Sequence, residues 1–144
     1  VPNPGSVSYF LNFLLDNVKI VISGPNDVFE QLFKANEQDI VIGISYPRYS
    51  KRTVEALSYA KEKGCKILTI TDSLTAPATQ YADYTLIASS NMFSFVDSLV
   101  APMSLINAFI VALGTKKGKQ ITERFEDLEK IWKRYDVYIT ATND

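Results

Sequence analysis

A short segment of the chain gathers residue types that bind small anions. It reads SYPRYSKRT at residues 45–53 and follows directly on an apolar run. Hydroxyls from Ser45 and Ser50 and the free backbone N–H groups of such a turn attract a phosphate or carboxylate, and a helix beginning at Ser50 favours the same charge at its N-terminus. Arg48 adds a guanidinium fork, which fits a phosphate better than a lysine ammonium does. The segment therefore predicts recognition of a small anion.

The same letters admit a plainer interpretation, in which the serines only cap a helix while the cations face water. A second hydroxyl-bearing turn, NPGSVS, precedes another helical pattern and offers Gly5, Ser6 and Ser8. Two such turns favour the anion interpretation, because each would place backbone N–H groups and hydroxyls at a helix start. We therefore expect Ser6, Ser45 and Ser50 to face one pocket at the carboxyl edge of a sheet.

A third polar loop, TDSLTAPATQYAD at residues 71–83, follows another apolar run. Asp72 and Ser73 in this loop suit the hydroxyls of a sugar, although an Asx-type turn ahead of Pro77 explains the same pattern. The candidate ligand-binding residues are the polar, tyrosine and glycine positions of these loops, together with one serine of a later apolar stretch. They are Gly5, Ser6, Ser8, Ser45, Tyr46, Arg48, Tyr49, Ser50, Thr53, Asp72 and Ser98.

The composition excludes several classes of function. The chain has no histidine, which removes Ser/His/Asp and Cys/His triads, histidine metal sites and imidazole bases, and we expect neither a metal nor a cofactor. Its 15 Lys and Arg nearly cancel its 16 Asp and Glu, so this segment alone is not expected to bind DNA. The single cysteine, Cys65, fits a reducing, cytoplasmic setting and a place in the core. The start, VPNPGSVSY, lacks the pattern of a signal peptide.

The elements that must position these loops alternate along the chain. Near-continuous apolar, β-branched runs predict strands at 18–23, 39–45, 65–71 and 84–88. Helical patterns lie at 8–17, at 26–36 with Asn26 or Asp27 as N-cap, and at 50–64 with Gly64 at the C′ position. This alternation predicts a doubly wound α/β fold, a parallel sheet covered on both faces, and the 144 residues suit a single domain.

Two helical patterns follow the predicted strands. The stretch at 95–113 nears the length of a membrane span, but polar residues and Pro102 interrupt it, so a buried helix or a dimer interface fits the pattern better than lipid does. Residues 121–139 have the spacing of an amphipathic helix, and GTKKGKQ at 114–120 predicts a helix break. The amount of apolar helix surface predicts a homodimer or a higher homo-oligomer.

The stretch DIVIGISYPRYSKRTVEALSYAKEKGCKILTITDS, followed by ADYTL and FVDSLVAPMSLINAFIVAL, has the order of a known family. It resembles the sugar isomerase (SIS) domain of RpiR-type bacterial transcriptional regulators over about residues 5–113. The resemblance implies a three-layer αβα fold with a parallel sheet of flavodoxin-like order, 2-1-3-4-5. It also implies a first serine turn at Gly5, Ser6 and Ser8 and a phosphate-binding turn from Ser45 to Ser50.

The chain departs from the family in three ways. Many SIS domains have Ser-Gly where this chain has Pro47 and Arg48, which exchanges a hydroxyl and a flexible glycine for a guanidinium. The family's first strand, an inner one, should precede Gly5, where only VPNP stands, so that strand is expected to be missing. The family's DNA-binding helix-turn-helix domain is absent from this sequence. We expect one SIS-type domain over 1–144, with its core at about 5–113 and a C-terminal helix at about 119–139.

These observations predict an effector-sensing domain of a transcriptional regulator that binds a phosphorylated sugar or related anionic metabolite without turnover. DNA would be bound only through the helix-turn-helix domain, and no membrane partner is expected. One alternative is a ketose/aldose phosphosugar isomerase that uses Asp72 or Asp97 as its base, although no pair of carboxylates stands out. Another is a dimerisation module without a ligand.

Overall fold

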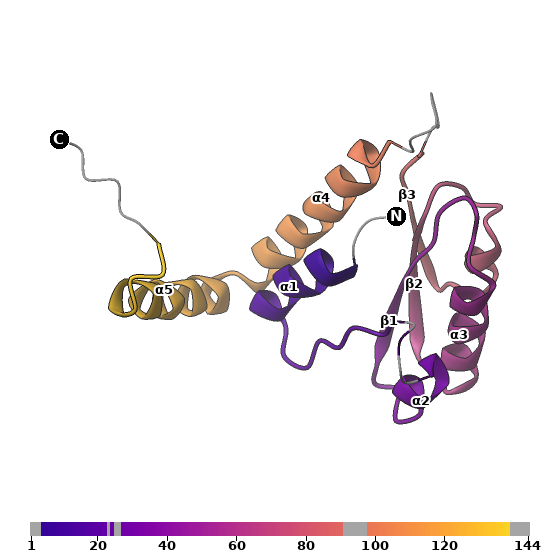
Figure 1. The fold of residues 1–144 in the computed structure, drawn as a ribbon, viewed down its shortest axis with the longest axis horizontal. Coiled ribbons are helices and arrows are strands. Elements are labelled where there is room, and N and C mark those ends of the chain that lie inside the picture. The colour runs from indigo at the N-terminus through magenta and orange to yellow at the C-terminus, as the bar shows by residue number, and fades with distance from the viewer. Residues whose placement is uncertain (1–3, 23, 25–26, 91–97, 139–144) are drawn as a thin grey trace.

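The computed structural model describes residues 4–22, 24, 27–90 and 98–138 (Figure 1). Its elements follow one another in the order helix, helix, strand, helix, strand, 3-10 helix, strand and two long helices. They are α1 (Pro4–Leu14), α2 (Val28–Leu32), β1 (Ile40–Ile44), α3 (Lys51–Glu62), β2 (Lys66–Thr71), η1 (Pro77–Tyr81), β3 (Tyr84–Ile87), α4 (Val100–Lys117) and α5 (Lys119–Arg134).

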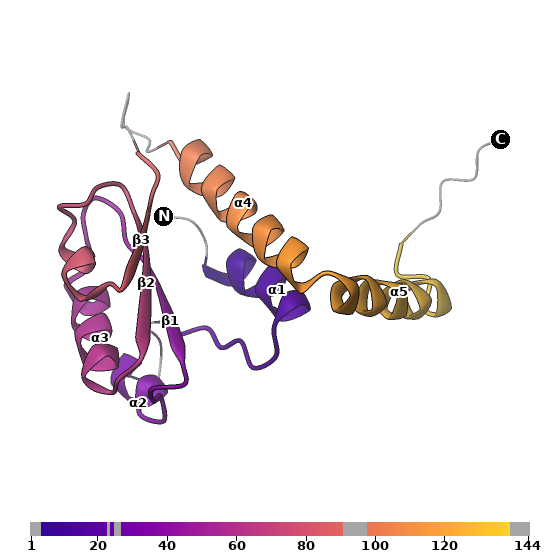
Figure 2. The ribbon, with the colours of Figure 1, turned by 180° about the vertical axis from the view of Figure 1, so that it is seen from behind.

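The described strands form one parallel sheet in the order β1-β2-β3. Ile44 pairs with Ile70, and Thr71 pairs with Ile87, so all three strands end at the same edge. α3 covers one face of the sheet, and α1 and α4 cover the other (Figures 1 and 2). The predicted α/β fold with helices on both faces of a parallel sheet is confirmed, and three of the four predicted strands lie where the sequence indicated.

The two core layers meet at the central strand, β2. Ile67 packs on one side with Leu57 of α3 and Ala78 of η1. Ile70 packs on the other side with residues of α1 and α4. Both isoleucines are essentially inaccessible to solvent. Successive side chains of a strand point to opposite faces of the sheet. Ile67 and Ile70 are three residues apart, so they point to opposite faces and each contributes to one of the two core layers.

The predicted strand at 18–23 is wrong for residues 18–22, which belong to no strand of the described sheet; Ser23 lies outside the described residues. The Gln31 side chain takes the hydrogen bonds that a neighbouring strand would supply. Its amide nitrogen donates to the Ile22 carbonyl at 2.8 Å, and its amide oxygen accepts from the Ile22 N–H at 3.4 Å. β-branched composition alone therefore did not produce a strand here, since no strand of the described sheet pairs with these residues.

α1 begins at Pro4, earlier than the helical pattern predicted from residue 8. Proline suits the first position of a helix because its φ is preset and its missing N–H would have had no partner there. NPGSVS is consequently not a turn in its described part: Gly5, Ser6 and Ser8 lie inside the helix. Gly5 and Ser6 nevertheless occupy the first turn of α1, so they lie at a helix start as the sequence predicted, and an anion facing them stays a prediction.

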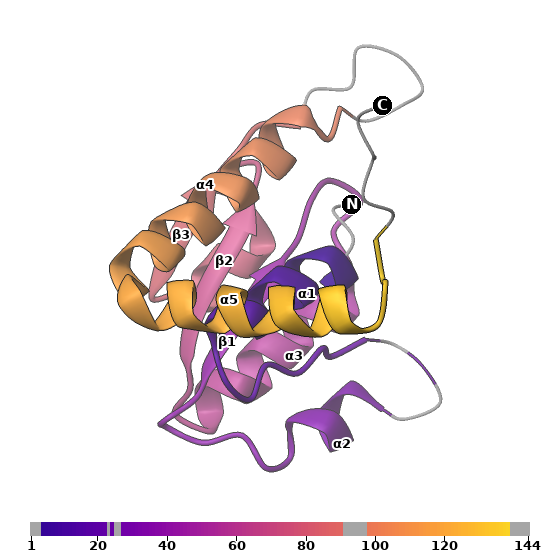
Figure 3. The ribbon, with the colours of Figure 1, turned by 90° about the vertical axis from the view of Figure 1, so that its left-hand side faces the viewer.

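The two C-terminal helices meet at the predicted break, where Gly118 has a φ of 55°. α5 extends away from the sheet (Figures 1 and 2) and runs in front of α1 when seen from its own side (Figure 3). None of its residues is buried in this chain. Phe125 of α5 stacks on Phe13 of α1 with ring centroids 5.8 Å apart, and Arg124 pairs with Asp16 at 2.9 Å. α4 begins at Val100, and residues 95–97 of the predicted helix lie outside the described part. Within the described ranges, no helix has the length and apolar character needed to cross a bilayer.

Candidate functional site

The β1-to-α3 turn keeps a buried hydroxyl at its base. Ser45 continues the sheet ladder by donating its N–H to the Ile70 carbonyl at 3.0 Å, and only 4% of its surface is exposed. A side chain at Gly43 would meet Leu57 of α3, so Ser45, two residues further along the extended chain, faces the same α3 side. Its hydroxyl has no hydrogen-bond partner among the described residues. A buried hydroxyl without a partner is uncommon, and this one belongs to the turn that leads into α3.

Ser50 begins α3 as predicted. Its side-chain oxygen accepts from the Thr53 N–H at 3.3 Å, and its backbone is extended, with φ of −74° and ψ of 118°. An N-cap satisfies only part of a helix start, so N–H groups of the first turn remain directed outward. Together with the aligned peptide dipoles of a 12-residue helix, these groups favour an anion.

Arg48 occupies the left-handed region, with a φ of 64°. That conformation costs a residue with a side chain about 1–2 kcal/mol, whereas glycine adopts it without that penalty. The strain falls at the position where the resemblance expects glycine, so the backbone keeps the turn's geometry although the side chain is a guanidinium. Arg48 therefore lowers the stability of the turn relative to glycine and adds a positive charge near the start of α3.

Arg48→Gly is expected to raise the free energy of unfolding by about 0.5–1 kcal/mol relative to Arg48→Ala, because only glycine relieves the strain at this φ. Urea denaturation of the two variants measures the difference directly. Equal stability of the two variants would contradict a strained backbone at this position.

Asp72 joins the turn to the loop after β2. Tyr49 donates its hydroxyl to Asp72 Oδ1 at 2.8 Å, and Thr71 donates to the same oxygen at 3.2 Å. The Tyr46 hydroxyl is buried and has no hydrogen-bond partner in the described part of the chain. Burial and the Asp72 charge raise the Tyr46 pKa. Burial and then the hydrogen bond to Asp72 raise the Tyr49 pKa. Both phenols therefore stay protonated at neutral pH, and the Tyr49 hydroxyl acts as a donor to Asp72.

The candidates Ser6, Ser8 and Ser98 lie in or next to other helices, α1 and α4. Ser8 is buried within α1, where the Asn12 amide donates to its carbonyl at 2.9 Å and contacts its hydroxyl at 3.3 Å. Ser6 and Ser98 are exposed. Among the described residues, no hydrogen bond joins the serines of α1 to the β1-to-α3 turn, so a common pocket for Ser6, Ser45 and Ser50 stays a prediction. Asp97 lies outside the described residues.

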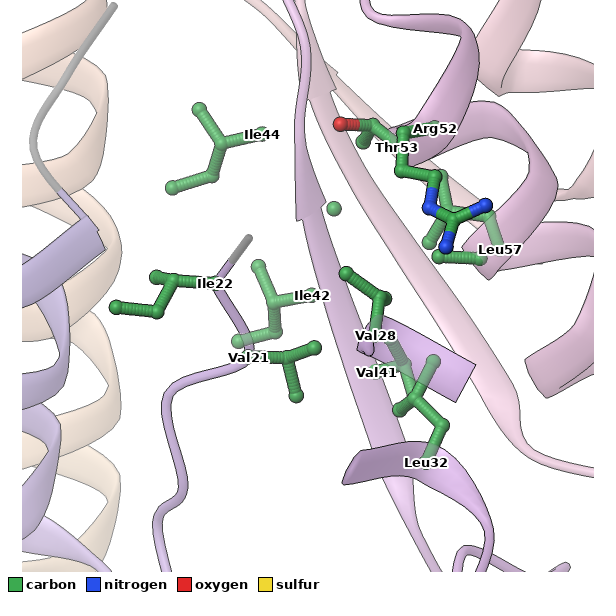
Figure 4. A pocket seen from close by; sticks show the side chains of 12 residues that line it. Val21, Ile22, Val28, Leu32, Val41, Ile42, Ile44, Arg52, Thr53 and Leu57 are labelled. Carbon is green, nitrogen blue, oxygen red and sulfur yellow. The ribbon is translucent and has the colours of Figure 1, made fainter. Parts of the chain in front are cut away.

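A cavity that the sequence did not reveal adjoins the first turns of α3. It has a volume of about 300 Å³ and lies between Val21 and Ile22 on one side and β1 on the other (Figure 4). Thr53 lines this cavity, and so does Arg52. Arg52 pairs with Asp27 and stacks on the Phe29 ring, 4.7 Å from its centroid. Most of the other lining residues are aliphatic, so this cavity is less suited to an anion than the β1-to-α3 turn is.

Two further polar groups have structural roles. Asp83 accepts from Lys61 Nζ at 2.7 Å and from the Ile67 N–H at 2.8 Å, and these bonds lower its pKa, the Lys61 bond most of all. It therefore ties α3 and β2 to the start of β3. The Cys65 thiol is buried, as predicted, and contacts the Asn36 carbonyl at 3.2 Å. Burial raises its pKa, which makes it a poor nucleophile.

Comparisons with known proteins agree with this architecture. Residues 7–112 match the protein family described as SIS domain. An uncharacterized HTH-type transcriptional regulator of Caldanaerobacter subterraneus is 26% identical over an alignment of 134 residues, and the match covers 88% of this chain and 48% of that protein. Glutamine–fructose-6-phosphate aminotransferase of Methanococcus maripaludis is 33% identical over 128 residues, 88% of this chain and 21% of the enzyme. The chain spans about half the length of the Caldanaerobacter relative.

Solved structures share the fold. The sugar isomerase domain of an RpiR transcription factor from Sphaerobacter thermophilus superposes with a TM-score of 0.81 at 23% identity, over 88% of this chain and 71% of that one. The Vibrio vulnificus NanR protein complexed with ManNAc-6P gives 0.73 at 12% identity, over 91% of this chain and 50% of that one. At these identities the likeness concerns the fold.

Proposed function

The chain belongs to the SIS domain family, and from that premise we propose that it is the effector-sensing domain of a transcriptional regulator. We propose that it binds a phosphorylated sugar or a related anionic metabolite without converting it. The observation that carries the proposal is the buried, unpartnered Ser45 hydroxyl in the turn that leads into α3. A phosphate at this helix start would supply the missing partner and would also meet the outward N–H groups.

The relatives support a transcriptional regulator as the protein that contains this site. A matched curated protein is an HTH-type regulator, and NanR, which shares the fold, has a solved structure in complex with ManNAc-6P, a sugar phosphate. In our proposal the whole protein binds DNA through a helix-turn-helix domain that this sequence does not include, and it acts in the cytoplasm. The ligand then changes how strongly the regulator holds its operator.

An isomerase remains the alternative function, because enzymes also occur among the relatives. Asp72 is the one candidate base in the described residues, and two hydroxyls hydrogen-bond to a single oxygen of its carboxylate. Among the described residues, the hydrogen bonds of Asp72 come from hydroxyls and none comes from a second acid, whereas an isomerase needs a positioned acid and base, so the arrangement favours binding over proton abstraction. This is the physical ground for proposing a sensor.

A thermal-shift screen of sugar phosphates, sugar acids and polyol phosphates tests the proposal. A phosphorylated sugar at 100 times its Kd is expected to stabilise the folded chain by about 2.7 kcal/mol. Ser45→Ala, which removes the buried hydroxyl but little volume, should reduce that stabilisation. NMR of the best ligand with the protein over many hours separates the functions: an unchanged ligand supports sensing, and a new ketose or aldose supports the isomerase.

We also propose that the chain forms a homodimer or higher homo-oligomer through α4 and α5. Val100 and Val111 of α4 and Ile131 of α5 are half or more exposed, and the amphipathic α5 has no buried residue in a single chain. Covering these faces with a second copy would remove apolar surface from water.

Sedimentation equilibrium at micromolar concentration is expected to give a mass of at least twice 16.1 kDa. Ile131→Lys should shift the mass toward one chain, since a buried lysine would have to be desolvated at the interface. The exposed Ile40, on β1, provides the control as Ile40→Lys. A single 16.1 kDa species for the unaltered chain would contradict the proposal.

A further inference from the structure

The proposed ligand site carries a fixed negative charge close to the helix start. Tyr49, which adjoins the N-cap Ser50, reaches the Asp72 carboxylate with its hydroxyl at 2.8 Å. The carboxylate therefore lies about one tyrosine side chain away from the place proposed for the phosphate. A hexose phosphate has its ring and its far substituents at a similar distance from its phosphorus atom.

The surroundings of Asp72 orient this charge without cancelling it. Both hydrogen bonds come from neutral hydroxyls, those of Tyr49 and Thr71, and both are accepted by Oδ1. The carboxylate is half-buried, so its field is screened less than that of a fully exposed group. The raised pKa of the nearby Tyr46, to which this charge contributes, is consistent with such a field.

We infer that Asp72 determines which phosphorylated sugars the site accepts. The inference rests on the proposed function and adds a ligand class: phosphate monoesters whose sugar end carries an ammonium or neutral hydroxyls, and not sugar acids. An ammonium or a hydroxyl donates to the carboxylate, whereas a second carboxylate on the ligand would face a like charge. The site is therefore positive at the α3 end and negative at the Asp72 end.

Calorimetric titrations with three matched probes, glucosamine 6-phosphate, glucose 6-phosphate and 6-phosphogluconate, test the inference. At pH 7 and constant ionic strength, the amino sugar is expected to bind about tenfold more tightly than glucose 6-phosphate. The acid should bind about tenfold more weakly than glucose 6-phosphate. Asp72→Asn, which keeps the shape and removes the charge, should bring all three affinities within about threefold of one another. Tyr49→Phe removes a hydrogen bond and keeps the carboxylate, so it should retain the order of the probes.

The outcomes separate this inference from the proposed function. Equal binding of the three probes by the unaltered chain, or an unchanged order in Asp72→Asn, would overturn the role of Asp72 while leaving a sugar phosphate site in place. Failure of all three probes and of inorganic phosphate to bind would overturn the proposed function and this inference with it. A collapsed order in Asp72→Asn together with a retained order in Tyr49→Phe would establish the charge as the determinant.

Discussion

Arg48→Ala is expected to weaken binding of a phosphorylated ligand by about 1.5–3 kcal/mol, and Ser50→Ala by about 1–2 kcal/mol. The guanidinium gives charge-assisted hydrogen bonds, whereas the hydroxyl gives a neutral one, so the arginine should matter more. Pro47 fixes its own φ and stiffens the approach to this position. Binding by the unaltered chain should weaken as salt rises, because ions screen the cationic turn, and Arg48→Ala should lose much of that dependence.

Lys51→Ala is the matched control for this experiment. Lys51 stands in the first turn of α3, its side chain is 90% exposed, and it pairs with Glu55 at 3.5 Å. A solvated cation paired along its own helix should contribute little to ligand binding. Calorimetry and urea denaturation on all variants separate affinity from folding, and Arg48→Ala should change stability little, because alanine keeps the strained φ.

Unchanged affinity and salt dependence in Arg48→Ala would show that the turn holds something other than an anion. Tyr46 or Tyr49 would then close the site over an uncharged ligand. The Ser45 hydroxyl would still need a partner in that case, and a neutral hydroxyl of the ligand is the natural one.

The site was predictable from sequence as far as its local chemistry. A serine ahead of a helical pattern predicts an N-cap, and Ser50 is one, because capping depends on residues within one turn. The bond between Tyr49 and Asp72 was not predictable in the same way, since 23 residues separate the two partners. Only the parallel pairing of β1 with β2 brings their loops together at one edge.

The fold shows the same division between local and non-local information. The run at 39–45 became β1 because it has a neighbour, β2, to pair with. The equally β-branched run at 18–23 has no such neighbour along its described residues: a cavity of about 300 Å³ separates Val21 and Ile22 from β1. In the strand order that the resemblance implies, the family's first strand lies in the sheet between the strands that these two runs would form. Composition reports how well a residue suits a strand, but hydrogen-bonding partners decide whether one forms.

The largest expected effect on stability belongs to Ile70, whose side chain is 1% exposed. It joins the central strand to Val7 and Leu11 of α1 and to Ile106 of α4. Ile70→Ala should lower the free energy of unfolding by about 3 kcal/mol, because it removes buried methyl groups and leaves a cavity between rigid elements. Urea denaturation, with the midpoint and slope fitted together, measures this loss.

Ile87→Ala on β3 is the control, since Ile87 is 43% exposed and should cost less than about 1 kcal/mol. Ile70→Val should cost about 0.5–1.5 kcal/mol and keeps the test informative if the alanine variant does not fold. The Ile70 carbonyl accepts the Ser45 N–H at 3.0 Å, so the same strand position also holds the base of the β1-to-α3 turn. Equal losses for Ile70→Ala and Ile87→Ala would show that α1 and α4 do not pack on the sheet at Ile70 in solution.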